Sequence, residues 1–303
     1  MSSIDGIAFQ TALGRILAEP EINDRFVADP QATGAELGLD AEQIAALESA
    51  GVGRLRAFAH SLYSKRSELL RKVCPATCEL LHQRGRLPAL AGRFVREHPP
   101  IESREHSSRT LRDGFWFLEF LCRLQTQGEF DDPLVVEVAR FELAWLSVTA
   151  REAALESAIA FQQAAERHAS LTKDDMLAAQ PRRGSHCRIE AFTVDILDVV
   201  HALAEGRAPE SSTGTSPESD AEPTLVLFTK LPGWRNVRYA KVNEPTRQVF
   251  DRCDGRASCR QIIAHLHRER VLDDDPDAFG DRCLALFARL AKINAITFEP
   301  RPC

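Results

Sequence analysis

From Ile7 to about Leu171, apolar residues recur at intervals of three and four, which predicts a succession of amphipathic helices. Strand-like alternation is scarce over this stretch. Among the helices expected there, one begins near Thr110 and another near Leu134, after the Asp-Asp-Pro break. We therefore expect residues 1–178 to form an N-terminal helical bundle.

Capping and breaking residues divide this helical half of the chain. Asp40 precedes AEQIAAL and is placed to cap a helix there, while Gly51 and Gly53 end that helix and open the next. The next helix is expected over about 55–81. Pro75 should kink or break it, because proline lacks the backbone N–H that a helix interior uses.

After the bundle the pattern changes to that of a small mixed domain, expected over residues 184–303. The run CRIEAFTVDI, from Cys187, alternates like a strand, and DVVHALAEG after it is helical. The segment 206–223 is rich in Ser, Pro, Gly and acidic residues, so we expect a disordered loop. The strand-like runs TLVLFTK and RNVRYAKV follow, joined by a hairpin-type connection at residues 231–234.

Three helices are predicted after these strands. Asn243 can cap the first, Ser258 and Gln261 form a capping box for the second, and Asp275 followed by proline starts the third. The tail AITFEP is typical of a closing strand. A hairpin with three short helices is the content of a winged-helix unit, which binds either nucleic acid or peptides. The expected fold class is therefore mainly α with a small α+β domain, namely a helical bundle followed by a winged-helix-like peptide-recognition domain.

Composition narrows the range of functions. The chain has 303 residues, 44% of them apolar, and a formal net charge of -6, which suits two domains and gives no general attraction to nucleic-acid phosphates. The apolar stretches fall short of the roughly 20 residues that a bilayer span needs, and the amino terminus lacks a signal-peptide pattern. The eight scattered cysteines are expected to be reduced thiols. We expect a cytoplasmic protein whose partners are neither nucleic acid nor membrane.

Three residues suggest a metal site, because Cys74, Cys78 and His82 lie at intervals of four. On a continuous helix this spacing would place two thiols and an imidazole on one face. Pro75 disturbs that helix, however, and structural zinc usually has its cysteines in a shorter hairpin. Because buried cysteine is a common core residue, we expect no metal there.

The aromatic residues Phe115, Trp116, Phe117 and Phe120 are too many for one helix face to bury, since consecutive residues point about 100° apart. Something must cover the other side of their helix. A central position in the core and a subunit interface are the two interpretations, and the first is the commoner.

The residues do not predict catalysis by this chain. An iron oxidase needs converging ligands, commonly two histidines and one carboxylate, whereas the nine histidines here are dispersed along the sequence. The sequence also lacks a glycine-rich phosphate loop, a nucleophile elbow and a zinc-protease signature. We expect neither enzymatic activity nor a cofactor in this chain.

Two segments of the sequence resemble known protein families, and these resemblances indicate a function. The ordered motifs LYSKRSELLRKVCPATCELL, RFVREHPP, FLEFL and VARFELAW, between Leu62 and Trp145, resemble the helical amino-terminal domain of proteins that accompany multinuclear non-haem iron oxidative enzymes. The partner subunits of methanobactin and thiaglutamate biosynthesis belong to that family. In the last quarter of the chain, NEPTRQVFDRCDGRASCRQIIAHL, from Asn243, resembles the peptide chaperone of pyrroloquinoline-quinone biosynthesis, a leader-peptide recognition element.

The second resemblance implies that a leader peptide adds as a strand to an exposed sheet edge and places side chains in pockets beside the third helix. On this chain the edge corresponds to residues 235–242, and the pocket wall to one face or the other of the third helix. The peptide-binding positions are then Arg235, Val237, Arg238, Tyr239 and Lys241 on the edge, with Leu284, Phe287 and Ala291 on the helix.

Together these observations predict a non-catalytic subunit. It would bind the leader of a ribosomal precursor peptide and present the core, expected to be a cysteine, to a partner multinuclear non-haem iron oxidative enzyme in a heterodimer. The iron would belong to the partner, and Phe115, Trp116, Phe117 and Phe120 would contribute to the interface. A winged-helix nucleic-acid-binding regulator and a metal or redox protein that uses Cys74, Cys78 and His82 remain the alternatives.

Overall fold

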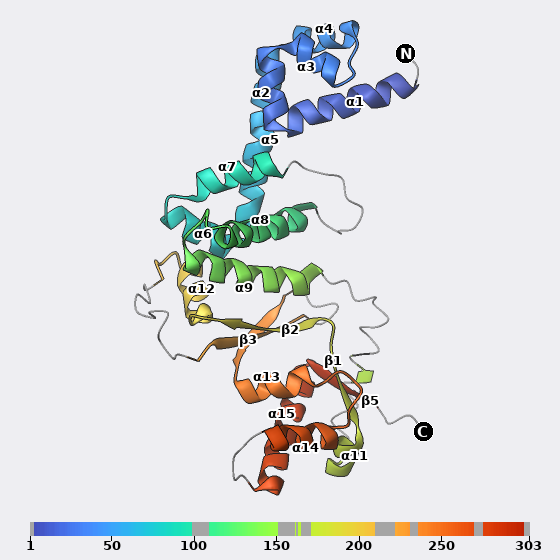
Figure 1. The fold of residues 1–303 in the computed structure, drawn as a ribbon, viewed down its shortest axis with the longest axis vertical. Coiled ribbons are helices and arrows are strands. Elements are labelled where there is room, and N and C mark those ends of the chain that lie inside the picture. Colours follow the sequence, from blue (N-terminus) through green and yellow to red (C-terminus); the bar gives the residue numbers. More distant parts are fainter. Residues whose placement is uncertain are drawn as a thin grey trace. The chain divides into compact units, whose positions relative to one another are not determined.

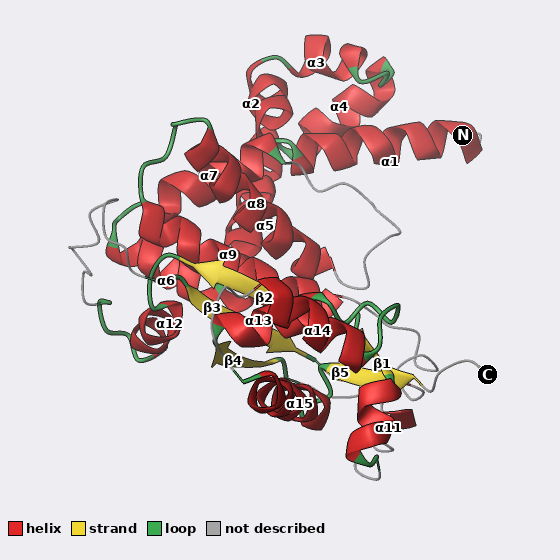
Figure 2. Cartoon of the chain, turned by 60° about the horizontal axis from the view of Figure 1, so that its bottom comes forward, coloured by secondary structure: helices red, strands yellow, loops and turns green. Residues whose placement is uncertain are grey.

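The computed structural model describes residues 3–98, 109–150, 161, 163–164, 171–209, 222–230, 236–269 and 275–299. The chain divides into two compact units, the first formed by Met1–Val135 with Gly206–Ala208, the second by Val136–Glu205 with Pro209–Cys303. Most described residues are helical, and the strands are few and antiparallel (Figures 1 and 2). The prediction of a mainly α protein with a small sheet is confirmed.

The described residues of the first unit form helices throughout its length. In chain order they are α1 (Ser3–Ala18), α2 (Pro20–Ala28), α3 (Pro30–Glu36), α4 (Ala41–Ala50), α5 (Val52–Val73), α6 (Pro75–Gln83), α7 (Leu87–Glu97) and α8 (Arg109–Thr126).

Local capping residues set these boundaries as expected. The Asp40 carboxylate accepts a hydrogen bond of 2.8 Å from the Gln43 backbone N–H, and the Gln43 side chain accepts one of 3.1 Å from the Asp40 N–H. Gly51 adopts a φ of 95°, which favours glycine, between α4 and α5. The long helix predicted over 55–81 is broken at Pro75, the first residue of α6.

Two apolar clusters hold the first unit together. The first joins α1, α2 and α4 through Ala12, Ile16, Ile22, Phe26, Leu39, Ile44 and Leu47. The second is aromatic: the Phe94 ring of α7 lies 5.3 Å from that of Phe117 and 5.7 Å from that of Phe120, both in α8. Beside it the buried guanidinium of Arg66 in α5 donates to the buried Asp113 carboxylate in α8, with a distance of 2.7 Å from Nε to Oδ2.

The second unit contains the strands. Its helices are most of α9 (Pro133–Ala150), α11 (Lys173–Ala178), α12 (Ile196–Ala204), α13 (Glu244–Asp251), α14 (Cys259–Glu269) and α15 (Pro276–Lys292), and its strands are β1 (Gln180–Arg183), β2 (Cys187–Phe192), β3 (Thr224–Thr229), β4 (Arg238–Val242) and β5 (Ile296–Glu299). The expected caps are present: the Asn243 side chain accepts from the Thr246 N–H, and Ser258 exchanges hydrogen bonds with Gln261.

The strands form two antiparallel sheets, β1 with β5 and a three-stranded sheet in the order β2-β3-β4. Every residue of β3 is buried, because helices cover both faces of the larger sheet. On one face the Phe141 ring of α9 lies 5.0 Å from the Phe228 ring of β3. On the other face Leu227 of β3 belongs to the core formed by α13, α14 and α15.

This covering corrects the expected domain boundary. The helix after Leu134 is expected in a helical domain over residues 1–178, whereas most of α9 belongs to the second unit. The reason is the contact of Phe141 with the rings of Phe192, Phe228 and Tyr239 across the sheet. The helix is thus one layer of the mixed unit.

Two predicted segments lie outside the residues that the structure describes. They are the middle of the expected disordered loop, residues 210–221, and the hairpin connection at residues 231–234. Among the described helices, none combines the length and apolar character needed to cross a membrane.

Candidate peptide-binding edge

Strand β4 lies at one margin of the three-stranded sheet, and no described strand pairs with its outer side. Its sequence alternates as a half-buried strand requires: Tyr239 faces the α9 layer, where its ring lies 5.3 Å from that of Phe141, whereas Arg238 and Ala240 are exposed on the opposite face. The expected strand and its alternation are therefore present. Arg235, also expected on this edge, lies outside the described residues.

The pairing register identifies the backbone groups that face outward. The Lys230 N–H donates to the His186 carbonyl, so even-numbered residues of β3 direct their backbone polar groups toward β2. Odd-numbered residues of β3 therefore face β4, where Leu227 opposes Ala240. Tyr239 and Lys241 must then direct their N–H and carbonyl groups away from the sheet, where an added strand could meet them.

One ion pair joins strand β4 to the N-terminus of α12. The Lys241 ammonium lies 2.8 Å from the Asp195 carboxylate, directly before α12. This hydrogen bond lowers the pKa of Asp195 and raises that of Lys241, so both groups are charged at neutral pH. Val237, just before the strand, is buried and anchors its other end.

A groove of about 300 Å³ begins at Asn243, the residue directly after β4, and extends between α13 and α15. Its lining consists of Asn243, Pro245, Gln248, Val249, Leu266, Phe279, Arg282, Cys283, Ala285, Leu286 and Arg289. This lining is mostly apolar, contains two arginines and contains no acidic residue. Its charge is therefore suited to an apolar segment that also carries carboxylates.

The groove corrects the expected pocket wall. Leu284, Phe287 and Ala291 are at most 9% exposed and belong to the core under α15, so they support the groove from within. The opposite face of α15, with Ala285, Leu286 and Arg289, provides the surface instead. The sequence does not decide between the two faces, because both carry apolar residues.

Strand β2 forms the other margin of the sheet, but the chain itself approaches that side. The Phe161 ring lies 4.7 Å from the His186 ring, immediately before β2. Phe161 and Ala164 also line a second cavity there, beside Cys187. The outer side of β4 is thus the less covered margin among the described residues.

The aromatic residues expected at a subunit interface lie mainly in the core of the first unit. Phe117 and Phe120 are at most 1% exposed and contact the Phe94 ring. The expectation that these two residues contribute to a subunit interface is therefore corrected, because both belong to the core. Phe115 and Trp116 are half-buried, and the Arg112 guanidinium lies 5.1 Å from the Trp116 ring centre.

The three residues of the candidate metal site do not share an environment. Cys74 precedes α6 and is buried near the Gly114 carbonyl, Cys78 is buried within α6, and His82 is exposed. In the part of the chain that the structure describes, no group of three or more histidine, cysteine or acidic residues has a metal-binding arrangement.

No protein-family model matches this sequence, and no curated protein matches it either.

Proposed function

We propose that this chain is a non-catalytic, cytoplasmic subunit that binds the leader of a ribosomal precursor peptide and presents its core to a multinuclear iron oxidative enzyme. The observation that carries the proposal is the outer side of β4, with which no described strand pairs, together with the groove that starts where this strand ends. The C-terminal unit would act as a winged-helix-like recognition element.

Strand addition at β4 supplies affinity through the peptide backbone. Tyr239 and Lys241 each offer one donor and one acceptor, and a leader strand pairs with them in the manner of other edge-binding domains. Because backbone pairing is independent of sequence, discrimination among peptides comes from side chains directed into the groove between α13 and α15.

The groove favours an acidic leader that carries an apolar anchor. Leu286 and Pro245, which are partly exposed, offer apolar surface for the anchor, while Arg282 and Arg289 attract carboxylates at its margin. Binding the leader raises the local concentration of the core peptide at the partner's iron site, so the chain contributes to the reaction without touching the reacting atoms.

The test first reads the genes beside the one for this chain for a short Cys-bearing open reading frame, and then uses a fluorescent peptide with the N-terminal sequence of that frame. Anisotropy should report saturable binding to the full chain, and Ala285→Trp, which fills the groove from an exposed position, should weaken it at least about ten-fold. Ala264→Trp, at an exposed position of α14 outside the groove, is the matched control. Equal affinity for both variants and the wild type would remove the groove from the proposal, and absence of wild-type binding would refute the function.

The partner is tested separately by co-expression with the neighbouring iron enzyme. Co-purification of a stoichiometric heterodimer supports the adaptor role, and turnover of the precursor should require both subunits. An enzyme that modifies the precursor at the same rate without this chain would contradict the proposal.

A further inference from the structure

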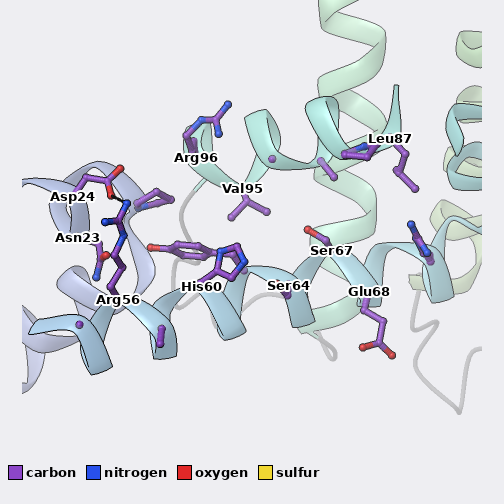
Figure 3. Close-up of a pocket in the computed structure, with 18 residues that line it drawn as sticks. Asn23, Asp24, Arg56, His60, Ser64, Ser67, Glu68, Leu87, Val95 and Arg96 are labelled. Atoms are coloured by element: carbon purple, nitrogen blue, oxygen red, sulfur yellow. Dashed lines mark ion pairs between the residues drawn. The ribbon is translucent and has the colours of Figure 1, made fainter. Parts of the chain in front are cut away.

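Helices α2, α5 and α7 of the first unit enclose an open cleft with a volume of about 930 Å³ (Figure 3). Figure 3 shows Asp24, Arg56 and Arg96 toward one end and Glu68 and Leu87 toward the other, so α5 and α7 run in opposite directions along it. The cleft follows α5 from Gly53 to Arg71, roughly 27 Å at the helical rise.

Small side chains line the helices that form the cleft. On α5 they recur at helical spacing and therefore share one face, and α7 adds more of them; the set is Gly53, Ala57, Ser64, Ser67, Ala91 and Gly92. A surface of this kind lets the backbone of a further helix approach two packed helices closely.

Gly92 indicates that the described residues do not fill this space. Glycine in the middle of a helix is less stable than alanine, so its presence there has to be explained. A Cβ added at Gly92 would meet only the end of the Arg96 side chain, at 3.8 Å. Among the described residues, therefore, no close neighbour requires the glycine, whereas an occupant of the cleft would.

The polar groups of the cleft also lack complete partners among the described residues. Asp24 lies 3.8 Å from Arg56, and Glu68 lies 3.2 Å from Lys72 outside the cleft, which leaves Arg71 and Arg96 without a described acidic partner. The Tyr63 hydroxyl is buried and has no described acceptor, and burial raises the pKa of Tyr63 to about 12, so the hydroxyl remains a donor.

We propose that this cleft is the docking site for an acidic amphipathic helix of the partner enzyme, with carboxylates that pair with Arg71 and Arg96. The proposal rests on the proposed function for the identity of the partner. Local charge selects the occupant: carboxylates of the docked helix meet Arg71 and Arg96, which have no acidic partner among the described residues. A helix fits better than a strand because two antiparallel helices offer no backbone hydrogen bonds to an extended segment.

The experiment measures two affinities of the full chain, for the immobilised iron enzyme by biolayer interferometry and for the labelled leader peptide by anisotropy. Gly92→Gln fills the cleft, and the double variant Arg71→Glu with Arg96→Glu reverses its charge. Lys65→Glu is the control, because Lys65 is exposed on α5 but does not line the cleft. We expect both cleft variants to lose about ten-fold or more in affinity for the enzyme, with the control and all leader affinities unchanged.

Unchanged enzyme affinity in the cleft variants overturns the docking proposal alone and leaves the proposed function standing. A wild-type chain that binds the leader but not the enzyme overturns the adaptor role itself. Two further results identify other occupants and also overturn the proposal. If Gly92→Gln converts a dimer to a monomer in light scattering, the occupant is a second copy. If deletion of residues 99–108 raises enzyme affinity at least about ten-fold and Gly92→Gln abolishes that gain, the occupant in the free chain is that segment.

Discussion

Replacing Lys241 by proline should impair leader binding without unfolding the sheet. The register directs the Lys241 N–H away from β3, so proline removes a donor that no ladder bond within the sheet uses. Tyr239 and Lys241 together offer four backbone hydrogen-bonding groups to an added strand. Removing one donor leaves a peptide carbonyl unsatisfied and should cost about 1–3 kcal/mol of binding free energy, which is roughly a 5- to 150-fold rise in Kd.

The matched control is Lys241→Ala, which removes the same ion pair with Asp195 but keeps the backbone N–H. Because that pair is well exposed, its loss should change leader affinity little. Both variants are measured by anisotropy with the same labelled leader, and far-ultraviolet circular dichroism confirms that each is folded. If both variants lose affinity equally, the effect belongs to the side chain. If neither does, the leader does not pair with β4, and the central argument for the function is wrong.

Three further predictions concern stability and follow from described contacts. Asp113→Ala should lower the free energy of unfolding in urea by about 3–5 kcal/mol, because it leaves the buried Arg66 guanidinium without its carboxylate. The double variant Arg66→Met with Asp113→Leu should recover most of this loss. Wild-type stability of Asp113→Ala would contradict the prediction. Gly114→Ala should destabilise the fold by about 1–3 kcal/mol, because the added Cβ would lie 2.3 Å from a methyl group of Val73. Gly92→Ala, whose Cβ would meet only the Arg96 side chain at 3.8 Å, should stabilise it by about 0.5–1 kcal/mol. Shifts of the thermal midpoint in the same direction for both variants would refute the comparison. Burial raises the pKa of Cys187 from 9.0 to about 12, so the stabilising contribution of its neutral thiol is complete below pH 9 and declines between pH 9 and about 12. The urea midpoint of Cys187→Ala should therefore fall less steeply than that of the wild type over pH 8–10.5. Parallel plots of urea midpoint against pH for the two proteins would refute this.

Local signals in the sequence predicted the elements well. Asp40, Asn243 and Ser258 cap helices through side-chain hydrogen bonds to residues three positions later, so their effect is visible in a short window of sequence. The break at Pro75 is local for the same reason. Strand β1 was missed, because Gln180–Arg183 contains a proline and is stabilised by pairing with β5 more than a hundred residues later.

Long-range packing decided what the sequence could not. The apolar residues of α9 showed that the helix buries a face, but not that Phe141 meets the sheet of the second unit. The third helix of that unit, α15, carries apolar residues on two faces, and only the fold shows that Phe287 enters the core while Leu286 lines the groove. Periodicity specifies which residues avoid water, and the tertiary contacts specify which element excludes it.

The helical layers on both faces of the β2-β3-β4 sheet constrain the sequence of any peptide that joins β4. Side chains of a joined strand must alternate between the side of the α9 layer and the side that carries the groove between α13 and α15, since neighbouring residues of a strand point to opposite faces. Residues that determine specificity should therefore occur at every second position of the peptide. In a deep mutational scan of the precursor's leader, positions that tolerate substitution should therefore alternate with positions that do not.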